Sequence, residues 1–526
     1  MTNRRRFLRR ASLAAGGAAL GALGVQRRPV LAAPGLLTSD DARPGIPCGA
    51  AVGDVASGHA VVWSKTDRPA RLLVEYATND AFRDSRRIVG PAALPETDFT
   101  ARVVLTQLPA SERLSYRVVF QDLTEPRRMS LPAAGSFVTA PDGRRDIVFA
   151  WSADTAGQGF GINPDWGGMK LYETMRLARP DFFVHCGDTI YADNPLEPEL
   201  RLDDGTVWRN LVTPSKAKVA ETLDEFRGNY RYNFLDDNVR RFNAEVPCVA
   251  LWDDHEVLNN WHAAKTIDDA RYRERSVPSL AARARRAFLE YMPIRPDAAD
   301  PVRIYRSLPY GPSLEVFVVD IRSHRGPNGP GRQPASSAET ALLGAAQLQW
   351  LKAGLAASRA TWKAVVIGVP LGLTIADDFR NPGAGFESIA NGDGPALGRE
   401  LEIAELLRFL RERHVRNVVW LTGDVHYAAA HHYDPARARF KDFDPFWEFV
   451  AGPINAGTFG PNALDDTFGP QARFVAVPAG MKPNRPPSDG LQFFGTIRVE
   501  ARTQVATVRL HGLDGRALFT LELPPA

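Results

Sequence analysis

The sequence predicts an α/β protein with two domains, a small all-β domain followed by a larger domain in which buried strands alternate with helices. The chain has 526 residues, which is more than a single hydrophobic core usually serves. Apolar and polar residues alternate in short segments over residues 45–139. From residue 146 onward, continuous apolar runs are separated by helical stretches, a pattern typical of layered α/β domains.

The first 32 residues have the features of a twin-arginine (Tat) export signal. The segment Arg4-Arg5-Arg6-Phe7-Leu8-Arg9 precedes an Ala- and Gly-rich apolar run over 11–25, and small residues near Ala32 form a cleavage region. The run is too short for a stable membrane span, so we expect export through the Tat translocon to the periplasm or the medium. The alternative is a basic disordered tail.

Charge gives no support to nucleic-acid binding. The net charge is +3, and the predicted signal contains seven arginines and no acidic residue. Its removal leaves a mature chain with a net charge of −4, which does not attract a polyanion. Cys48, Cys186 and Cys248 are too few for a disulfide framework and leave room for one bridge at most.

Residues 44–140 are predicted to form a β-sandwich. Ala60-Val61-Val62-Trp63 is a run of strand formers, and apolar residues occupy every second position of 70–76, 101–105 and 114–120. Several half-buried strands in succession favour a sandwich. No cluster of His, Asp or Cys occurs in this segment. We therefore expect a structural role, with a binding or adhesin module as the alternative.

Residues 145–526 are predicted to form the α/β domain. Runs typical of strands buried on both faces occur at 147–151, 182–184, 246–252, 316–319, 364–367 and 418–421. Helical stretches lie between them at 168–179, 221–242, 279–291, 339–357 and 399–413. Three further strands near 494–499, 506–510 and 518–521 are expected to extend the same sheet system in an antiparallel sense.

Polar side chains follow four of these buried runs. The four segments are Ser152-Ala153-Asp154, His185-Cys186-Gly187-Asp188, Asp253-Asp254-His255-Glu256 and Gly423-Asp424-Val425-His426. Because ligands bind beyond the carboxyl ends of strands in open α/β sheets, we expect the four segments to converge on one site. A glycine before Asp188 and before Asp424 allows the backbone to turn tightly there.

The converging carboxylates predict a metal site. Five of them in one place repel one another unless cations hold them: Asp154, Asp188, Asp253, Asp254 and Asp424. Oxygen ligands mixed with imidazole suit two divalent or trivalent ions such as iron, calcium, manganese or zinc. A pair of such ions can generate hydroxide and clamp a phosphoryl oxygen.

These motifs resemble those of the PhoD-type alkaline phosphatases, within the calcineurin-like metallophosphoesterase superfamily. The resemblance is carried by Gly187-Asp188-x-x-Tyr191, Trp252-Asp253-Asp254-His255-Glu256 and Gly423-Asp424-Val425-His426, supported by Asp320-Ile321-Arg322 and the helix at 343–351. It covers nearly the whole chain. It implies a fibronectin-like β-sandwich, then an αββα metallophosphoesterase domain that hydrolyses small phosphate monoesters or diesters by metal-hydroxide attack.

The resemblance also implies a role for each site residue. The metal ligands are Asp154, Asp188, Tyr191, Asp253, Asp254, Asp424 and His426, and Asp188 is shared between the two ions. Tyr191 suggests a ferric ion, and the implied cofactors are Fe(III) and Ca(II), with other divalent metals as alternatives. The catalytic residues are His255, which helps the leaving oxygen depart, and Arg322, which holds the phosphate. A structural salt bridge is the alternative for Arg322.

Two departures from the family pattern leave the metal open. Asp154-Thr155-Ala156 lacks the histidine of the superfamily's D-x-H motif, and the cysteine ligand of many PhoD-type enzymes is absent. The alternative function is therefore a periplasmic metal- or phosphate-binding protein with a degenerate site. A Gly- and Asp-rich loop over 377–393 is expected to gate the site, and His431 and His432 are expected on a loop.

Overall fold

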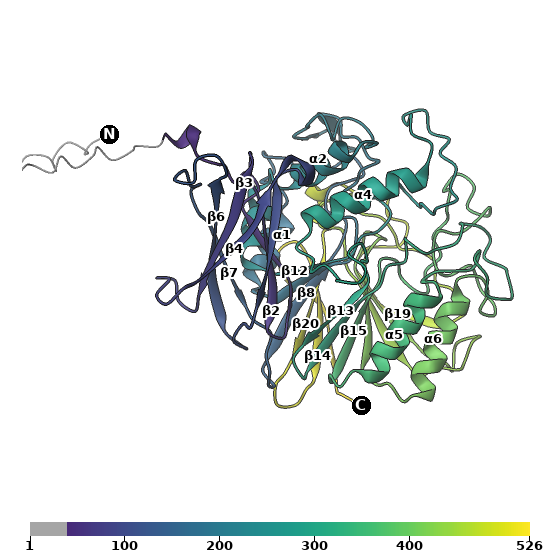
Figure 1. The fold of residues 1–526 in the computed structure, drawn as a ribbon. Helices are drawn as coiled ribbons and strands as arrows, with labels where there is room; N and C mark the ends of the chain where they lie inside the picture. Colours follow the sequence, from purple (N-terminus) through teal and green to yellow (C-terminus); the bar gives the residue numbers. More distant parts are fainter. Residues whose placement is uncertain (1–38) are drawn as a thin grey trace, which may run out of the picture. The chain divides into compact units, whose positions relative to one another are not determined.

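Two large mixed β-sheets form the framework of the protein, shown in Figure 1 by a computed structural model that describes residues 39–526. The predicted export signal, residues 1–32, lies outside the described residues. None of the helices in the described part of the chain is long and apolar enough to span a membrane. Cys48, Cys186 and Cys248 are all free thiols.

The first sheet has nine strands in the order β22-β21-β20-β8-β9-β12-β1-β2-β5. Its strands are β1 (Ala50–Ala56), β2 (His59–Lys65), β5 (Thr100–Thr106), β8 (Ile147–Ser152), β9 (Phe182–His185), β12 (Cys248–Ala250), β20 (Phe494–Val499), β21 (Ala506–His511) and β22 (Ala517–Leu523). Strands β8, β9 and β12 are parallel, and β20 to β22 extend the sheet antiparallel from β8, as the sequence predicts.

The second sheet has seven strands in the order β13-β14-β15-β16-β18-β17-β19. They are β13 (Arg306–Tyr310), β14 (Leu314–Val318), β15 (Trp362–Val366), β16 (Val418–Thr422), β17 (Ala429–Tyr433), β18 (Phe446–Val450) and β19 (Pro470–Val475). Aromatic contacts join the two sheets: the ring centroids of Trp151 and Phe449 are 6.4 Å apart, and those of Phe182 and Tyr310 are 4.8 Å apart. The hydrophobic core therefore lies between the sheets.

Helices cover the outer faces of this two-sheet core. They are α1 (Lys170–Leu177), α2 (Leu223–Asn233), α3 (Asp237–Glu245), α4 (Val277–Tyr291), α5 (Ala345–Ala357) and α6 (Glu400–Glu412), with short 3₁₀ turns η1 (Asp40–Ala42), η2 (Pro95–Thr97) and η3 (Pro487–Asp489). Helices α5 and α6 lie side by side next to the second sheet (Figure 1). The layering is that of the predicted αββα domain.

The N-terminal sandwich is continuous with the larger domain. Its second sheet has the order β4-β3-β6-β7 and consists of β3 (Ala70–Ala77), β4 (Arg86–Ala93), β6 (Arg113–Asp122) and β7 (Ala133–Val138). Its first sheet, β1-β2-β5, belongs to the nine-stranded sheet because β1 pairs in parallel with β12 at Gly53 and Cys248. A Cβ atom at position 53 would lie 2.5 Å from the Cys248 carbonyl oxygen, so this approach requires glycine.

Three local expectations need correction. The stretch 221–242 forms two helices, because the Asp236 side chain accepts hydrogen bonds from Asn238 N and Val239 N and caps a new helix there. Helix α5 begins at Ala345 instead of residue 339, after Gly344 with φ 74°. His431 and His432 lie on strand β17, where His431 Nδ1 is 3.0 Å from Glu448 Oε2 of β18. A small hairpin of β10 (Glu199–Arg201) and β11 (Val207–Arg209) completes the fold.

Candidate metal centre

The four predicted segments meet between the carboxyl ends of β8, β9 and β12 on one sheet and of β16 on the other. At Asp154, Asp188, Asp424 and His426 the backbone is left-handed, with φ of 64°, 54°, 68° and 59°. Such conformations cost about 1 kcal/mol or more each for residues other than glycine, and they concentrate at functional sites. The fold thus accepts local strain at four of the predicted ligands.

The two predicted glycines are required by close packing beneath the site. A Cβ atom at Gly187 would lie 2.4 Å from Cβ of Asp253, and one at Gly423 would lie 2.3 Å from Cβ of Ala153. Gly187 also has φ 114°. Any side chain at these positions would push the strand ends apart and separate the carboxylates.

A first donor group consists of Asp154, Asp188 and His426, whose ligand atoms lie within 4.8 Å of one another. The Tyr191 hydroxyl oxygen is 2.9 Å from Nε2 of His426 and belongs to the same group. His426 Nδ1 donates to the carbonyl oxygen of Gly457 at 2.5 Å, which leaves Nε2 as the ligand atom. Both carboxylate oxygens of Asp154 are buried without a hydrogen-bond partner. A buried carboxylate in this state needs a cation.

A second donor group adjoins the first. Asp188, Asp254 and His255 bring ligand atoms within 4.8 Å of one another, and so do Asp253, Asp254 and Asp424. Asp188 therefore belongs to both groups, as a ligand shared by two ions would. All these carboxylates are buried except that of Asp424, which is partly exposed at 13% of its side chain. The predicted ligand set is thus assembled in one place.

The acidity of these groups reflects the crowding of negative charge. Burial raises the pKa of Asp154, Asp188 and Asp424 well above the usual range, and the neighbouring carboxylates raise it further. Burial also raises the pKa of Asp253 to about 6. Two multivalent cations would reverse these shifts, because they favour the ionised carboxylates. The residues present therefore fit a two-metal centre with oxygen, phenol and imidazole ligands.

Glu256 holds two strand ends together behind the carboxylates. Its side chain accepts hydrogen bonds from the backbone N–H groups of Asp188 at 3.1 Å, Thr189 at 2.7 Å and Asp253 at 2.7 Å. Burial raises the pKa of Glu256 to about 7. Glu256 belongs to the Asp253-Asp254-His255-Glu256 motif, but no local pattern predicts this cross-linking role.

His255 is oriented by a carboxylate that the sequence analysis missed. His255 Nδ1 lies 2.8 Å from Oδ1 of Asp193, and Oδ2 of Asp193 accepts from the backbone N–H of Asn259 at 2.9 Å. Burial opposes protonation of the imidazole, but Asp193 and Asp254 outweigh it and raise the pKa of His255 to about 9. The ring also stacks on Tyr191 at 4.2 Å between centroids. The only sequence signal for Asp193 was its place two residues after Tyr191.

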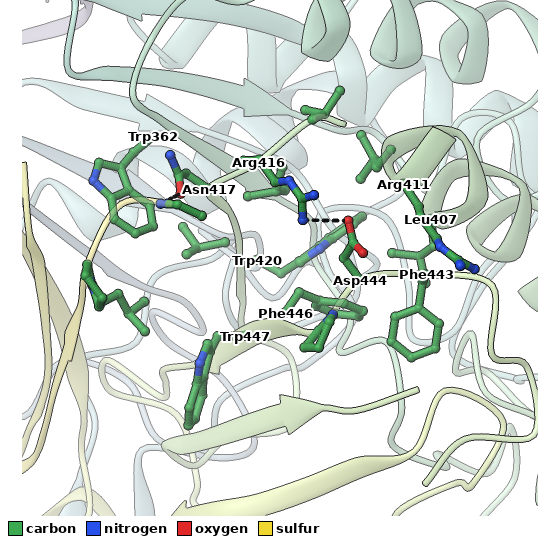
Figure 2. A pocket seen from close by; sticks show the side chains of 18 residues that line it. Trp362, Leu407, Arg411, Arg416, Asn417, Trp420, Phe443, Asp444, Phe446 and Trp447 are labelled. Carbon is green, nitrogen blue, oxygen red and sulfur yellow. Dashed lines mark hydrogen bonds and ion pairs between the residues drawn. The ribbon is translucent and has the colours of Figure 1, made fainter. Parts of the chain in front are cut away.

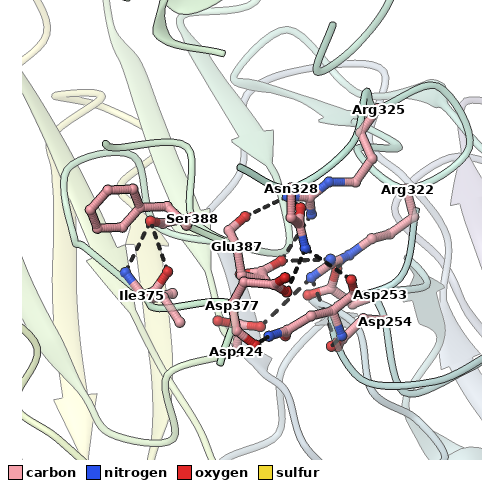
Figure 3. Close-up of polar contacts among 12 residues, drawn as sticks. Asp253, Asp254, Arg322, Arg325, Asn328, Ile375, Asp377, Glu387, Ser388 and Asp424 are labelled. Carbon is pink, nitrogen blue, oxygen red and sulfur yellow. Dashed lines mark hydrogen bonds and ion pairs between the residues drawn. The ribbon is translucent and has the colours of Figure 1, made fainter. Parts of the chain in front are cut away.

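Arg322 is fully buried among the carboxylates of the second donor group (Figure 3). Its Nε donates to Asp253, and its Nη1 lies 2.6 Å from Oε1 of Glu387. Nη2 is 3.8 Å from one oxygen of Asp254 and of Asp424. These contacts are those of a buried ion-pair network, the alternative considered for this residue. The phosphate-binding role of Arg322 stays a prediction.

The predicted loop over 377–393 is attached to the metal centre at two points. The side-chain amide of Asn260 donates to the carbonyl oxygen of Asp377 at 2.9 Å, and the backbone N–H of Asn260 donates to Asp254 at 2.6 Å. Farther along the loop, Glu387 pairs with Arg322 and, at 2.9 Å, with Arg325. Figure 3 shows these side chains gathered around the Arg322 guanidinium. The loop's position is therefore coupled to that of the carboxylates.

A cavity of about 210 Å³ lies elsewhere in the molecule (Figure 2). It is lined by Trp362, Val418 and Phe446, which are the first residues of β15, β16 and β18. The metal centre lies at the opposite, carboxyl ends of the strands. Arg416 and Asp444, the charged residues joined by a dashed line in Figure 2, form an ion pair with 3.0 Å between Nη1 and Oδ2, so each charge has a partner. This cavity contains no metal-ligand group and is not part of the centre.

Comparisons with known proteins agree with this arrangement. The family model described as PhoD-like phosphatase matches residues 149–510, and the model of its N-terminal domain matches residues 31–141. The chain is 28% identical over 444 residues to alkaline phosphatase D of Bacillus subtilis, covering 80% of this chain and 71% of that protein.

Two solved structures share the fold. The structure of PhoD has a TM-score of 0.65 at 21% identity and covers 91% of this chain and 92% of its own. Purple acid phosphatase PPD1 from yellow lupin (Lupinus luteus) seeds has a TM-score of 0.55 at 12% identity and covers 91% of this chain and 74% of its own. These likenesses confirm the predicted architecture, a β-sandwich followed by an αββα domain.

Proposed function

The chain belongs to the PhoD-like phosphatase family, and from this membership we propose that it is an exported two-metal phosphoesterase that hydrolyses small phosphate monoesters or diesters. Its phosphoesterase activity follows from the family and from its similarity to alkaline phosphatase D. The observation that supports a two-metal mechanism best is the membership of Asp188 in two adjoining donor groups. Asp188 would help to hold both ions, and the pair would supply the activated nucleophile and the charge stabilisation for displacement at phosphorus.

We assign Fe(III) to the first donor group and Ca(II) to the second. Asp154, Asp188, Tyr191 and His426 include a phenol and an imidazole, which suit a ferric ion. The second group is formed mainly of the carboxylate oxygens of Asp188, Asp253, Asp254 and Asp424, which are the hard ligands that calcium prefers. When bound, the ions supply an activated nucleophile and neutralise the charge of the phosphate.

The chain's own residues prepare the leaving group and the electrostatics. His255 is protonated at neutral pH because of Asp193 and Asp254, and Asp193 holds its Nδ1 proton. Its Nε2–H is therefore the group that can give a proton to the departing oxygen. Arg322 offsets the negative charge of the ligand Asp253 and of Glu387, which favours the ionised form of both carboxylates against the effect of burial.

The test is metal content and hydrolysis on one purified sample. Elemental analysis is run beside rates on p-nitrophenyl phosphate and bis(p-nitrophenyl) phosphate, with Asp188→Ala as the inactive variant. Asp204→Ala, in an exposed turn between β10 and β11, is the matched control. We expect iron and calcium in the wild type and in the control, and loss of hydrolysis and of iron, with less bound calcium, in Asp188→Ala. The ratio of the two rates ranks monoesters against diesters.

Two results would contradict the proposal in different ways. Metal without turnover on either ester would favour the binding protein considered as the alternative. In that case His255→Asn would leave ligand binding unchanged, whereas in an enzyme it lowers the rate and leaves metal in place. Absence of bound metal would refute the assignment of the strand-end carboxylates as ligands.

Export is a separate part of the proposal, supported by the residues at the start of the chain. Replacing Arg4 and Arg5 by lysine keeps the positive charge but removes the paired arginines that the pathway reads. We expect the wild-type protein outside the cytoplasm and the variant inside it, measured by fractionation. Equal export of both would refute the twin-arginine route.

A further inference from the structure

A second group of buried oxygen atoms lies at the start of α6, apart from the residues of the metal centre. Asn391, Glu400 and Asp465 are each at most 2% exposed. Asn391 Nδ2 donates to Oε2 of Glu400 at 3.0 Å. The hydroxyl of Thr467 lies beside the carboxylates of both Glu400 and Asp465. The contacts therefore bring three oxygen-bearing side chains close together.

One oxygen of each of these side chains lacks a partner. Asn391 Oδ1, Glu400 Oε1 and Asp465 Oδ2 are buried without a hydrogen bond, whereas the second carboxylate oxygens are satisfied. Oε2 of Glu400 accepts from the backbone N–H of Leu397 at 3.1 Å, and Oδ1 of Asp465 accepts from that of Thr467 at 2.7 Å. A buried polar atom without a partner is unfavourable, and a buried carboxylate oxygen especially so.

No basic side chain compensates these carboxylates. Among the ion pairs of residues 39–526, none includes Glu400 or Asp465, and the neighbouring Arg439 pairs with Asp466 at 2.8 Å instead. Asp393 adds further negative charge near Asp465. The Thr467 hydroxyl and the N–H of Gly392 lie beside the carboxylates, but no ion pair offsets their charge, so the group attracts a cation.

The backbone supplies another oxygen at the same place. The segment Asn391-Gly392-Asp393-Gly394 is held against residues 465–467 because Gly394 N donates to Asp466 and Asp466 N donates to Asp393, both at 2.9 Å. The carbonyl oxygen of Gly394 accepts from the Thr467 hydroxyl at 3.1 Å and keeps a second lone pair. All candidate ligand atoms are thus oxygens, from one amide, two carboxylates and one carbonyl.

We propose that this group binds one calcium ion, through Asn391 Oδ1, Glu400 Oε1, Asp465 Oδ2 and the Gly394 carbonyl, with water completing the coordination. Calcium takes six to eight oxygen ligands in flexible geometry, which suits a set collected from a loop, a helix start and a distant segment. The ion fastens the end of the 377–393 loop to α6 and to residues 465–467. Glu387 of this loop pairs with Arg322, which lies among the carboxylates of the second donor group. The calcium site therefore restrains the position of that group.

The proposal is tested by counting calcium. Equilibrium dialysis with ⁴⁵Ca²⁺ compares the wild type with Glu400→Gln/Asp465→Asn, whose substitutions keep size and remove charge. The matched control is Glu402→Gln on the same helix, where the carboxylate accepts from Leu343 N at 2.7 Å and is not part of the group. The same pair of substitutions is also made in an Asp188→Ala chain, in which calcium binding at the metal centre is weakened.

We expect the double variant to bind one calcium equivalent less per chain in both backgrounds, with iron content unchanged and Glu402→Gln equal to the wild type. Chelation should lower the melting temperature of the wild type by about 2–4 °C more than that of the double variant. Equal calcium in all chains would overturn the proposal. Protonation of Glu400 would then explain how its unpartnered carboxylate oxygen is tolerated. Should the double variant not fold, the Asp188→Ala chain alone decides: absence of calcium in it at about 1 mM free calcium would equally overturn the site.

Discussion

Oδ1 of Asp193 lies 2.8 Å from Nδ1 of His255, and this contact fixes both the orientation and the charge of the imidazole. Removal of the carboxylate charge by Asp193→Asn should lower the His255 pKa from about 9 toward its ordinary value near 6.5. We expect a fall in kcat of about 10- to 100-fold with metal content retained. The alkaline limb of the pH profile should move to lower pH, because the protonated imidazole is lost earlier. An unchanged limb would show that His255 does not act as the acid.

Tyr191 offers a spectroscopic test of the metal assignment. Its hydroxyl lies 2.9 Å from His426 Nε2 in the first donor group. A ferric phenolate absorbs visible light by charge transfer, so Tyr191→Phe should remove the colour of the purified protein and weaken iron binding about tenfold or more. The control is Tyr232→Phe, which removes a buried hydroxyl bonded to the backbone at residues 162 and 211. A visible band that survives in Tyr191→Phe would exclude phenolate ligation.

The buried ion pairs of Arg322 predict a large effect on stability. Arg322→Ala leaves Asp253 and Glu387 without their shared cation, and we expect the free energy of unfolding to fall by about 3–5 kcal/mol. Adding Glu387→Gln to the same chain should cost less than Glu387→Gln does alone, because Arg322 is already absent and Glu387 then keeps only its pair with Arg325 among the two arginines. Denaturant unfolding of the single and double variants measures the coupling. Additive losses would mean that the two side chains do not interact.

Asp98 predicts a pH dependence of stability in the N-terminal sandwich. Its carboxylate is 2.9 Å from Lys65 Nζ and 2.6 Å from Arg231 Nη1, and it accepts from the Tyr291 hydroxyl. Burial opposes ionisation, but these partners outweigh it and hold the pKa of Asp98 below its usual range. A lowered folded-state pKa stabilises the fold above the unfolded-state pKa near 3.9, and this stabilisation is lost as the pH falls through the folded-state value.

Thermal unfolding of Asp98→Asn against the wild type measures this contribution. We expect a deficit of about 1–2 kcal/mol at pH 7 that shrinks below about pH 4. Asp67→Asn breaks an exposed pair with Arg68 and should cost less than about 1 kcal/mol. A deficit in Asp98→Asn that stays constant from pH 7 to pH 3 would contradict an ionic origin.

The buried strands and the predicted ligands were accessible from the sequence because both leave local patterns. Continuous apolar runs predict β8, β9, β14, β15 and β16. The polar segments that follow the runs lie together at the carboxyl ends of the strands, as predicted. Strand β17 was missed because its sequence, Ala429-Ala430-His431-His432-Tyr433, places a polar pair inside the sheet. That pair is tolerated only because His431 meets Glu448 across the strands, a contact that no local pattern records.

The residues that support the site were harder to predict from the sequence, because contacts between distant residues leave no local pattern. Asp193, Glu256 and Glu387 act through partners that are 62 to 68 positions away in the chain, and their roles depend on tertiary contacts. Glu387 also lies in a loop whose composition gave no indication of burial. The pattern at 221–242 likewise predicts one helix where the structure has two, since Asp236 both caps α3 and accepts from Met169 N.

The pairing of β1 with β12 has a consequence for the newly made chain. Gly53 pairs with Cys248, which leaves the ribosome 195 residues later. At about 5–20 residues per second, β1 waits about 10–40 seconds for its partner while β2 already covers its other side. During that time its unpaired N–H and C=O groups are open to a second nascent chain. Protein synthesised at high density is therefore exposed to mispairing at β1, and slow translation between residues 53 and 248 lengthens the exposure.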